Sequence, residues 1–214
     1  MSKHHPTLRT NAAPRRAFTL IEILAVVAII GLLAAILVPA ISAAMRSAQK
    51  TVTKGTFAQW ASAIASYKTT YGSYPPLNDT ASDTEDSYYD LDNADQLKNF
   101  IRSLSARNLD GTELSTEEIK KYNERNRVFC TFDSSVFRNK DPKTEKLVDF
   151  TDNSRIHITL DTDGNNSILI QGELPGTKAE LGLLDNNKKS CNILIYTLAK
   201  EAPGRDGENI FVAQ

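Results

Sequence analysis

The sequence predicts an α+β protein in which a long N-terminal helix packs on a C-terminal, largely antiparallel β-sheet. Three observations predict this fold class. An apolar run near the N-terminus has the length of a membrane-crossing helix, an amphipathic pattern continues it, and most of the strand-like segments lie in the last third of the chain. Because helical signals come first and strand signals last, we expect segregated helices and sheet rather than alternating βαβ units.

The composition bounds the class of protein. The 214 residues suffice for one compact domain with extensions. The net charge of −1 conceals an uneven distribution, because four of the 25 basic residues precede the first acidic residue, Glu22. Without the first 17 residues, 21 basic side chains remain against 26 acidic ones. This mildly acidic body has no basic stripe to neutralise phosphates, so we expect no nucleic-acid partner.

The apolar run spans the 24 residues from Phe18 to Ile41. As a helix it would be ~36 Å long, which exceeds the ~30 Å hydrocarbon core of a bilayer, so membrane lipid is an expected partner. The basic residues before it predict a cytoplasmic N-terminus and export of the rest of the chain. They are Lys3, Arg9, Arg15 and Arg16.

Glu22 is the one ionisable residue in this run. A carboxylate inside an apolar membrane helix costs roughly 2.5 to 3.5 kcal/mol. An α-amino group four residues earlier, on the same chain or a neighbouring one, would offset that cost. Such an amine exists only if the chain is cut before Phe18.

The stretch around this point resembles the cleavage and methylation site of type IV prepilins. The residues that carry the resemblance are Arg15-Arg16-Ala17-Phe18-Thr19-Leu20-Ile21-Glu22 and the apolar run after them, with Gly31 and Pro39. The resemblance implies that prepilin peptidase cuts between Ala17 and Phe18 and that the new Phe18 amine is methylated. It also implies that Glu22 is the charge partner of that amine between subunits. The family prefers glycine before the cut, where this chain has Ala17.

For the whole protein, the resemblance implies a pilin-like fold and a structural role without enzymatic activity. The subunit would sit in the inner membrane as a single-pass protein, with its C-terminal domain in the periplasm or outside. An inner-membrane assembly platform would then add it to a homo-oligomeric filament. That filament would be a type II secretion pseudopilus or a type IV pilus-like filament.

Two other signals fit part of the same segment. One is an ordinary secretory signal cut near Ser42-Ala43-Ala44, and the other is a twin-arginine signal at Arg15-Arg16. In either case the protein would be an exported or membrane-anchored enzyme or binding protein. Glu22 argues against both, because neither signal gives it a role. Catalytic motifs such as HExxH and GxSxG are absent, and His157 is the only histidine outside the leader.

After Pro39 the pattern becomes amphipathic. Apolar side chains recur at helical spacing through residues 42–71, at Phe57, Trp60, Ala61, Ile64 and Tyr71. We predict one helix from about Thr19 to Thr70, bent at Pro39 because proline lacks the N–H that a helix needs. Gly72 and the following prolines end it. The chain thus divides into a basic leader (1–17), a transmembrane and assembly helix (18–41), its amphipathic continuation (42–71) and a globular α+β domain (72–214).

Within the globular domain, helices precede strands. Asn78 to Asp95 holds seven acids and no Lys or Arg, which predicts a solvated loop or, alternatively, a partner-facing or cation-attracting patch. Apolar spacing from Leu97 to Leu104 predicts a short helix, and a capping box at Ser115 opens another that runs to about Asn126. The predicted strands are Val128–Phe132, Ile156–Leu160, Ile168–Gln171, Ile193–Leu198 and Ile210–Val212.

Two places are candidates for calcium. Residues 156–168 read as a β-hairpin with a tight turn, but Asp161, Asp163 and Asn165 alternate like the first ligands of an oxygen-rich calcium loop. A complete EF-hand is excluded, because Asn166 stands where its glycine belongs. The turn Tyr71-Gly72-Ser73-Tyr74-Pro75 resembles one in major pseudopilins, and that resemblance implies a calcium loop at residues 199–209, with Asp206 and Glu208 as donors.

The two cysteines, Cys130 and Cys191, are too few for a disulfide framework. In an exported domain they either pair with each other or remain two separately buried thiols.

Overall fold

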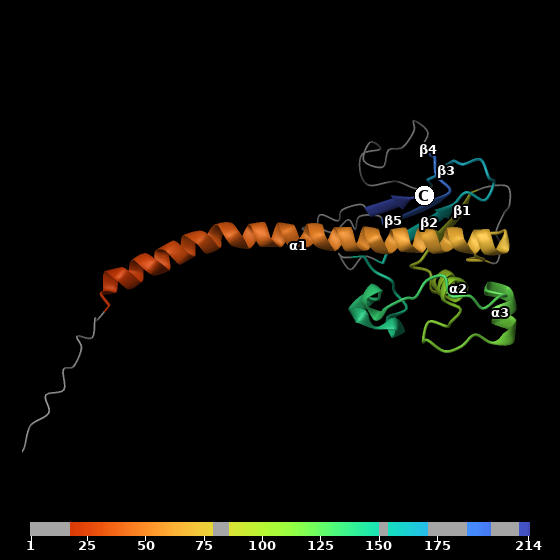
Figure 1. Cartoon of the computed structure of the whole chain (residues 1–214), viewed down its shortest axis with the longest axis horizontal. Helices are drawn as coiled ribbons and strands as arrows, with labels where there is room; N and C mark the ends of the chain where they lie inside the picture. Colours follow the sequence, from red (N-terminus) through yellow and green to blue (C-terminus); the bar gives the residue numbers. More distant parts are fainter. Residues whose placement is uncertain (1–17, 79–85, 150–153, 171–187, 198–209) are drawn as a thin grey trace, which may run out of the picture. The chain divides into compact units, whose positions relative to one another are not determined.

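The computed structural model describes residues 18–78, 86–149, 154–170, 188–197 and 210–214 (Figure 1). The chain divides into two compact units, Met1–Arg46 and Ser47–Gln214. The predicted leader, with Ala17, lies outside the described residues, as do Asp206 and Glu208.

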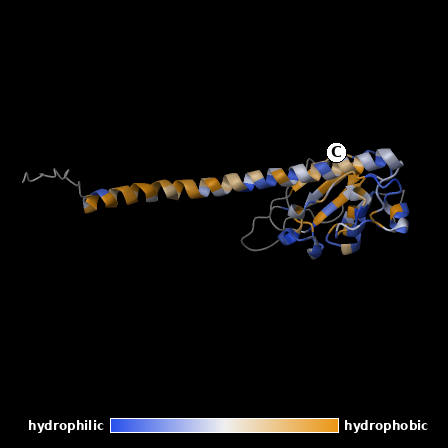
Figure 2. Ribbon diagram, turned by 60° about the horizontal axis from the view of Figure 1, so that its bottom comes forward, coloured by the Kyte–Doolittle hydropathy of each residue, from blue (hydrophilic) through white to orange (hydrophobic). Residues whose placement is uncertain are grey.

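The first unit contains the beginning of helix α1, which runs from Leu20 to Tyr71 and so confirms the predicted helix within one residue at each end. The hydropathy colouring of Figure 2 is mostly apolar along the first half of α1, apart from a hydrophilic segment at its start, where Glu22 lies. Among the described residues, α1 is the helix whose length and composition suit a membrane crossing. Pro39 lies inside α1, and the predicted bend there stays a prediction.

The second unit joins the rest of α1 to an antiparallel sheet with strand order β1-β2-β5-β6. Its strands are β1 (Ser87–Asp90), β2 (Ile156–Leu160), β5 (Ile193–Thr197) and β6 (Ile210–Ala213). The separate two-stranded ribbon consists of β3 (Ile168–Leu169) and β4 (Lys188–Lys189). Helices α2 (Ala94–Ser105) and α3 (Thr116–Tyr122) lie between β1 and β2 in sequence, followed by three short 3₁₀ turns, η1 (Ser134–Val136), η2 (Arg138–Lys140) and η3 (Pro142–Thr144). The predicted α+β class is confirmed.

The core of this unit forms between α1, α2 and one face of the sheet. Trp60 of α1 is 2% exposed, and its ring centroid lies 5.6 Å from that of Phe100 on α2 and 5.9 Å from that of Phe132. Ile158 of β2 and Ile195 of β5 belong to the same buried cluster. Figure 1 shows the second half of α1 running past the strands and past α2 and α3. The predicted packing of the amphipathic helix on the sheet is therefore confirmed.

Polar side chains fix the end of α1. Gly72 has φ of 79°, and its N–H donates to the Lys68 carbonyl at 2.8 Å, as expected of a helix C-cap. The Tyr71 hydroxyl donates to Oδ1 of the buried Asn123 at 2.5 Å. Asn123 also donates to the Ser103 carbonyl at 2.9 Å, so one amide joins the ends of α1, α2 and α3.

The capping box predicted at Ser115 is present. The Glu118 N–H donates to Ser115 Oγ at 3.3 Å, and the Ser115 N–H donates to Glu118 Oε2 at 2.9 Å. Helix α3 nevertheless ends at Tyr122, four residues before the predicted end. The Asn123 side chain accepts the Arg127 N–H at 2.9 Å, which turns the chain away from the helix axis.

Three predictions of local structure were wrong: one strand, one loop and one hairpin. Residues 128–132 are not a strand, because the N–H groups of Phe129 and Cys130 both donate to the Leu104 carbonyl at the end of α2. The acidic segment predicted to be a loop contains strand β1. The predicted hairpin does not form, since β2 pairs with β1 and β5 whereas β3 pairs with β4.

The two cysteines are unpaired. Cys130 is buried in the core cluster, whereas Cys191 is half-buried beside the cluster that covers the other face of the sheet. Burial raises the pKa of both thiols, to about 11 for Cys191, so they behave as small apolar groups.

Candidate functional site

The start of α1 is organised by two side chains that bond each other reciprocally. The Thr19 N–H and hydroxyl donate to Glu22 Oε2 at 2.8 and 2.9 Å, and the Glu22 N–H donates to Thr19 Oγ1 at 3.3 Å. This is the geometry of a capping box, in which two orphan helix donors are satisfied. The carboxylate that the sequence places in the apolar run thus already has partners within its own chain.

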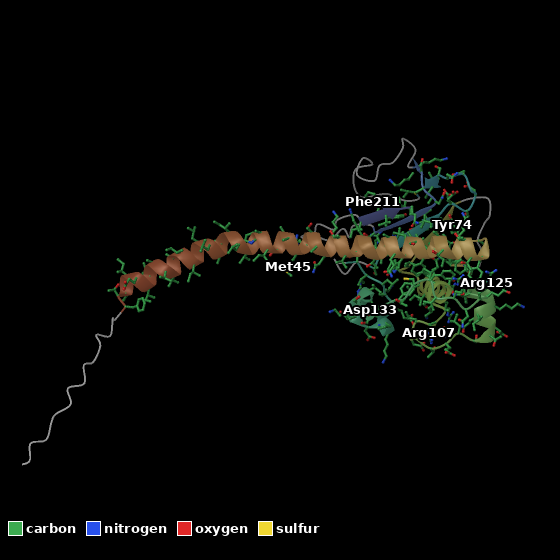
Figure 3. All side chains as sticks on the ribbon, viewed as in Figure 1. Met45, Tyr74, Arg107, Arg125, Asp133 and Phe211 are labelled. Carbon is green, nitrogen blue, oxygen red and sulfur yellow. The ribbon has the colours of Figure 1, made fainter. Side chains whose placement is uncertain are left out.

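The surface around this cap is apolar on every side of the helix. The large apolar side chains from Phe18 to Ile41 are each at least 52% exposed in the described structure, and Phe18 itself is 79% exposed. Figure 3 shows side chains projecting outward all around this part of α1. A continuous apolar surface of this extent requires lipid or other protein around it.

Residues 13–38 match the family model described as the prokaryotic N-terminal methylation motif. The chain carries a prepilin-type N-terminal signal. The match includes Ala17, Phe18 and Glu22, and it supports a type IV pilin-like or pseudopilin-type exported protein that is anchored in a membrane. No curated protein and no solved structure matches the chain.

The prepilin-type signal thus contains two of the predicted site residues: Phe18 lies two residues before α1, and Glu22 lies in its first turn. Thr19 was not among the predicted site residues. The sequence signal that identifies it is the spacing of three between Thr19 and Glu22, which is that of a capping box.

A second candidate site lies in the other unit, where three carboxylates gather at one end of β1 and β2. Ser87 pairs with Leu160 in the antiparallel register, so Asp86, just before Ser87, and Asp161, just after Leu160, also lie across from each other. Ligand oxygens of Asp86, Asp161 and Asp163 all lie within 4.8 Å of one another. The third predicted ligand, Asn165, uses its amide group to donate to Asp163 Oδ2 at 2.6 Å.

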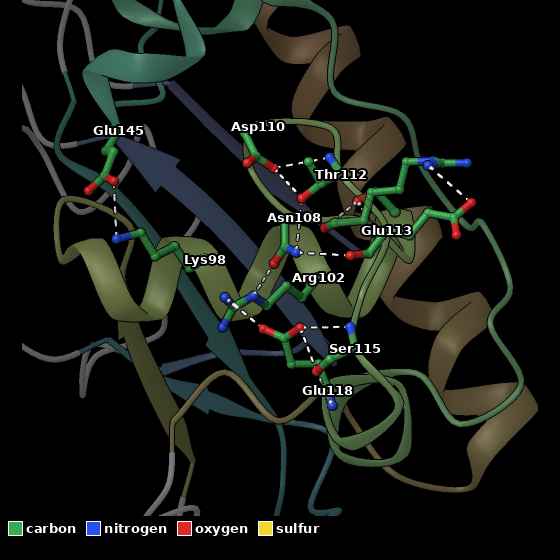
Figure 4. A network of polar contacts seen from close by, with 11 residues as sticks. Lys98, Arg102, Asn108, Asp110, Thr112, Glu113, Ser115, Glu118 and Glu145 are labelled. Atoms are coloured by element: carbon green, nitrogen blue, oxygen red, sulfur yellow. Dashed lines mark hydrogen bonds and ion pairs between the residues drawn. The ribbon is translucent and has the colours of Figure 1, made fainter.

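A polar cleft of about 560 Å³ lies beside α2 and α3 (Figure 4). Two ion pairs lie along it, since Arg102 Nη2 lies 2.9 Å from Glu118 Oε1 and Lys98 Nζ lies 3.1 Å from Glu145 Oε1. These pairs link α2 to the cap of α3 and to the end of η3. The arrangement explains how the helices are held.

His157 lies on β2 and faces two tyrosines. Its Nδ1 atom is 2.6 Å from the Tyr88 hydroxyl, and its ring stacks on that of Tyr88 with centroids 5.4 Å apart. The Tyr196 ring lies on β5 at 5.3 Å. The histidine is 4% exposed, so it is packed within the sheet.

Proposed function

We propose that this protein is a structural subunit of a type II secretion pseudopilus or a type IV pilus-like filament. The observation that carries the proposal is Glu22, an acid four residues past the expected cut and within a helix whose surface is apolar on all sides. The methylation motif at the same residues supports it. A signal peptide used only for export has no need of that acid.

In this proposal, prepilin peptidase cuts between Ala17 and Phe18 while the subunit is anchored in the inner membrane with its C-terminal domain in the periplasm. An assembly platform then moves the subunit into a filament. The apolar surface of α1 exchanges lipid for neighbouring helices, and Glu22 pairs with the Phe18 amine of a neighbour. A buried ion pair of this kind contributes more to register than to stability.

Substitution of Glu22 tests the charge pair. Glu22→Ala removes both the charge and the bonds to Thr19, whereas Glu22→Gln keeps an acceptor for the capping box and removes only the charge. We expect both variants to insert in the membrane but to give filament yields at least about tenfold below that of the wild type, since one lost buried charge partner is worth a few kcal/mol. Filament yield is measured by shearing and immunoblotting.

A wild-type yield from Glu22→Gln would contradict the charge pair and leave only the cap as a role for Glu22. The membrane content of each variant is the control, because a variant that fails to insert cannot report on assembly.

Mass spectrometry of the mature N-terminus separates the filament subunit from an exported or membrane-anchored enzyme or binding protein. We expect an N-methylated Phe18. An end near Ala44 would instead indicate an ordinary or twin-arginine signal, and an intact Met1 would indicate a plain anchor. Either of these two results would overturn the proposal.

A further inference from the structure

The three carboxylates at the end of β1 and β2 differ in exposure: Asp161 is buried, Asp86 is half-buried and Asp163 is exposed. Asp161 is 2% exposed, and its two oxygens accept the backbone N–H groups of Asn165 at 3.1 Å and Asn166 at 2.9 Å. Asp86 accepts the Leu169 N–H at 2.7 Å through Oδ2. These hydrogen bonds hold the carboxylates of Asp86, next to β1, and Asp161, next to β2, in place close to each other.

One oxygen of this cluster lacks a partner. Asp86 Oδ1 has no solvent contact and accepts no hydrogen bond among the described residues. A buried carboxylate oxygen without a donor or a cation is costly, and two further carboxylates within 4.8 Å increase that cost by repulsion. Burial, reinforced by Asp163 and Asp161, raises the pKa of Asp86. Lys188 on β4 opposes this effect.

We propose that Asp86, Asp161 and Asp163 form a calcium-binding site that joins the start of β1 to the loop after β2. Two oxygens bound to one calcium ion can be up to about 5 Å apart, because each lies 2.3 to 2.6 Å from the metal. The 4.8 Å limit on the cluster therefore suits a shared ion. Backbone carbonyls and water complete the six to eight oxygen ligands that calcium takes.

The ligand chemistry selects calcium among common cations. Among the described residues, no histidine or cysteine atom joins the group, which disfavours zinc. Three carboxylates suit calcium better than magnesium, which retains most of its water and uses one or two carboxylates.

The backbone of the loop is shaped for such a site. Gly164 has φ of 74° and Asn166 has φ of 57°, so the chain curls back and directs two N–H groups at Asp161. Asn166 therefore adopts the left-handed conformation for which an EF-hand uses glycine, and asparagine tolerates it better than most residues. Asn165 supports the loop by its bonds to Asp161 and Asp163. All three carboxylates lie in the second unit, so this proposal does not rest on the proposed filament function.

Calcium titration of the full-length protein in detergent micelles tests the proposal. After removal of metals with a chelator, we expect isothermal titration calorimetry to show calcium binding at this site, with a melting temperature that rises with calcium and much less with magnesium. We expect Asp86→Asn and Asp163→Asn each to weaken that binding at least tenfold. Asp86→Asn should also raise the melting temperature of the metal-free protein, because it removes a buried charge.

Two controls locate the site. Asp110→Asn alters an exposed acid that accepts hydrogen bonds from Thr112, and this variant should bind calcium like the wild type. The double variant Asp206→Asn, Glu208→Gln alters the other calcium candidate and should also retain this binding. Absence of calcium binding by the wild type, or undiminished binding by both Asp86→Asn and Asp163→Asn, would overturn the proposal. Asp161→Asn is a weaker test, because Asp161 also holds the loop.

Discussion

At the residue scale, His157 shows how a titratable group is accommodated inside the sheet. The Tyr88 hydroxyl lies 2.6 Å from Nδ1, where it can donate to a neutral imidazole, and Asp90 Oδ1 is 3.6 Å from the same atom. Burial lowers the pKa of His157, and the nearby Asp90 only partly opposes this effect. The neutral form is therefore the one that the folded protein favours.

The depressed pKa of His157 predicts a loss of stability in acid. The unfolded chain takes up a proton near pH 6.5, before the folded chain does, so the stability present above that pH declines as the pH falls toward the folded pKa. One histidine can change the free energy of unfolding by at most ~1.4 kcal/mol per pH unit. We expect His157→Gln to flatten the decline of melting temperature between pH 7.5 and 5.5. Parallel curves for the two proteins would contradict this prediction.

Residue patterns predicted one candidate site better than the other. Glu22 stands out because a carboxylate in an apolar run is costly wherever the run folds. Asp86 does not stand out, because it is one of seven acids between Asn78 and Asp95. Only the register that pairs Ser87 with Leu160 brings Asp86 to Asp161, and register is set by contacts between distant segments.

At the scale of elements, the second half of α1 is the support on which the second unit is built. Its buried residues begin at Thr53 and include Phe57, Trp60 and Ile64. The Trp60 ring contacts aromatic rings of α1 itself, α2 and the segment after α3. One face of this helix therefore fixes the positions of several other elements.

Truncation of Trp60 should strongly destabilise the second unit. We expect Trp60→Ala to lower the free energy of unfolding by about 3 to 5 kcal/mol, since it removes a large buried side chain and leaves a cavity. Val52, on the same helix but 69% exposed, is the matched control, and Val52→Ala should change stability by less than about 0.5 kcal/mol. Urea unfolding followed by far-UV circular dichroism measures both. Equal losses of unfolding free energy for the two variants would show that the Trp60 face of the helix does not stabilise the core.

The elements that sequence analysis predicted correctly are those with local causes. Helices α1 and α2 follow from apolar spacing, and α3 begins at its capping box. Residues 128–132 have the composition of a strand, but two of their N–H groups donate to a carbonyl at the end of α2 instead of to a neighbouring strand. Strand β1 was missed because its four residues lie among acids, and its burial alternates over too short a span to be recognised.

At the scale of the whole molecule, the division into two units predicts that the second can fold alone. Every described core residue lies after residue 46, and the sheet and both short helices are contained in Ser47–Gln214. The apolar surface that requires lipid or protein lies in the first unit.

A chain that begins at Ser47 should therefore be soluble without detergent and should unfold cooperatively. We expect its melting temperature to lie within a few degrees of that of the full-length protein, because few buried contacts are removed. Gel filtration and thermal circular dichroism measure this. Aggregation, or a broad transition without cooperativity, would show that the first unit is needed for folding.

The reciprocal bonds between Thr19 and Glu22 also bear on how subunits would leave a filament of the proposed kind. When a subunit separates from its neighbour, Glu22 loses the neighbour's amine but keeps the two donors of its own Thr19. The carboxylate that returns to the bilayer then stays hydrogen-bonded. This lowers the free-energy difference between the assembled and the free subunit. Such a subunit is suited to reversible assembly, in which disassembled chains return to the membrane and are used again.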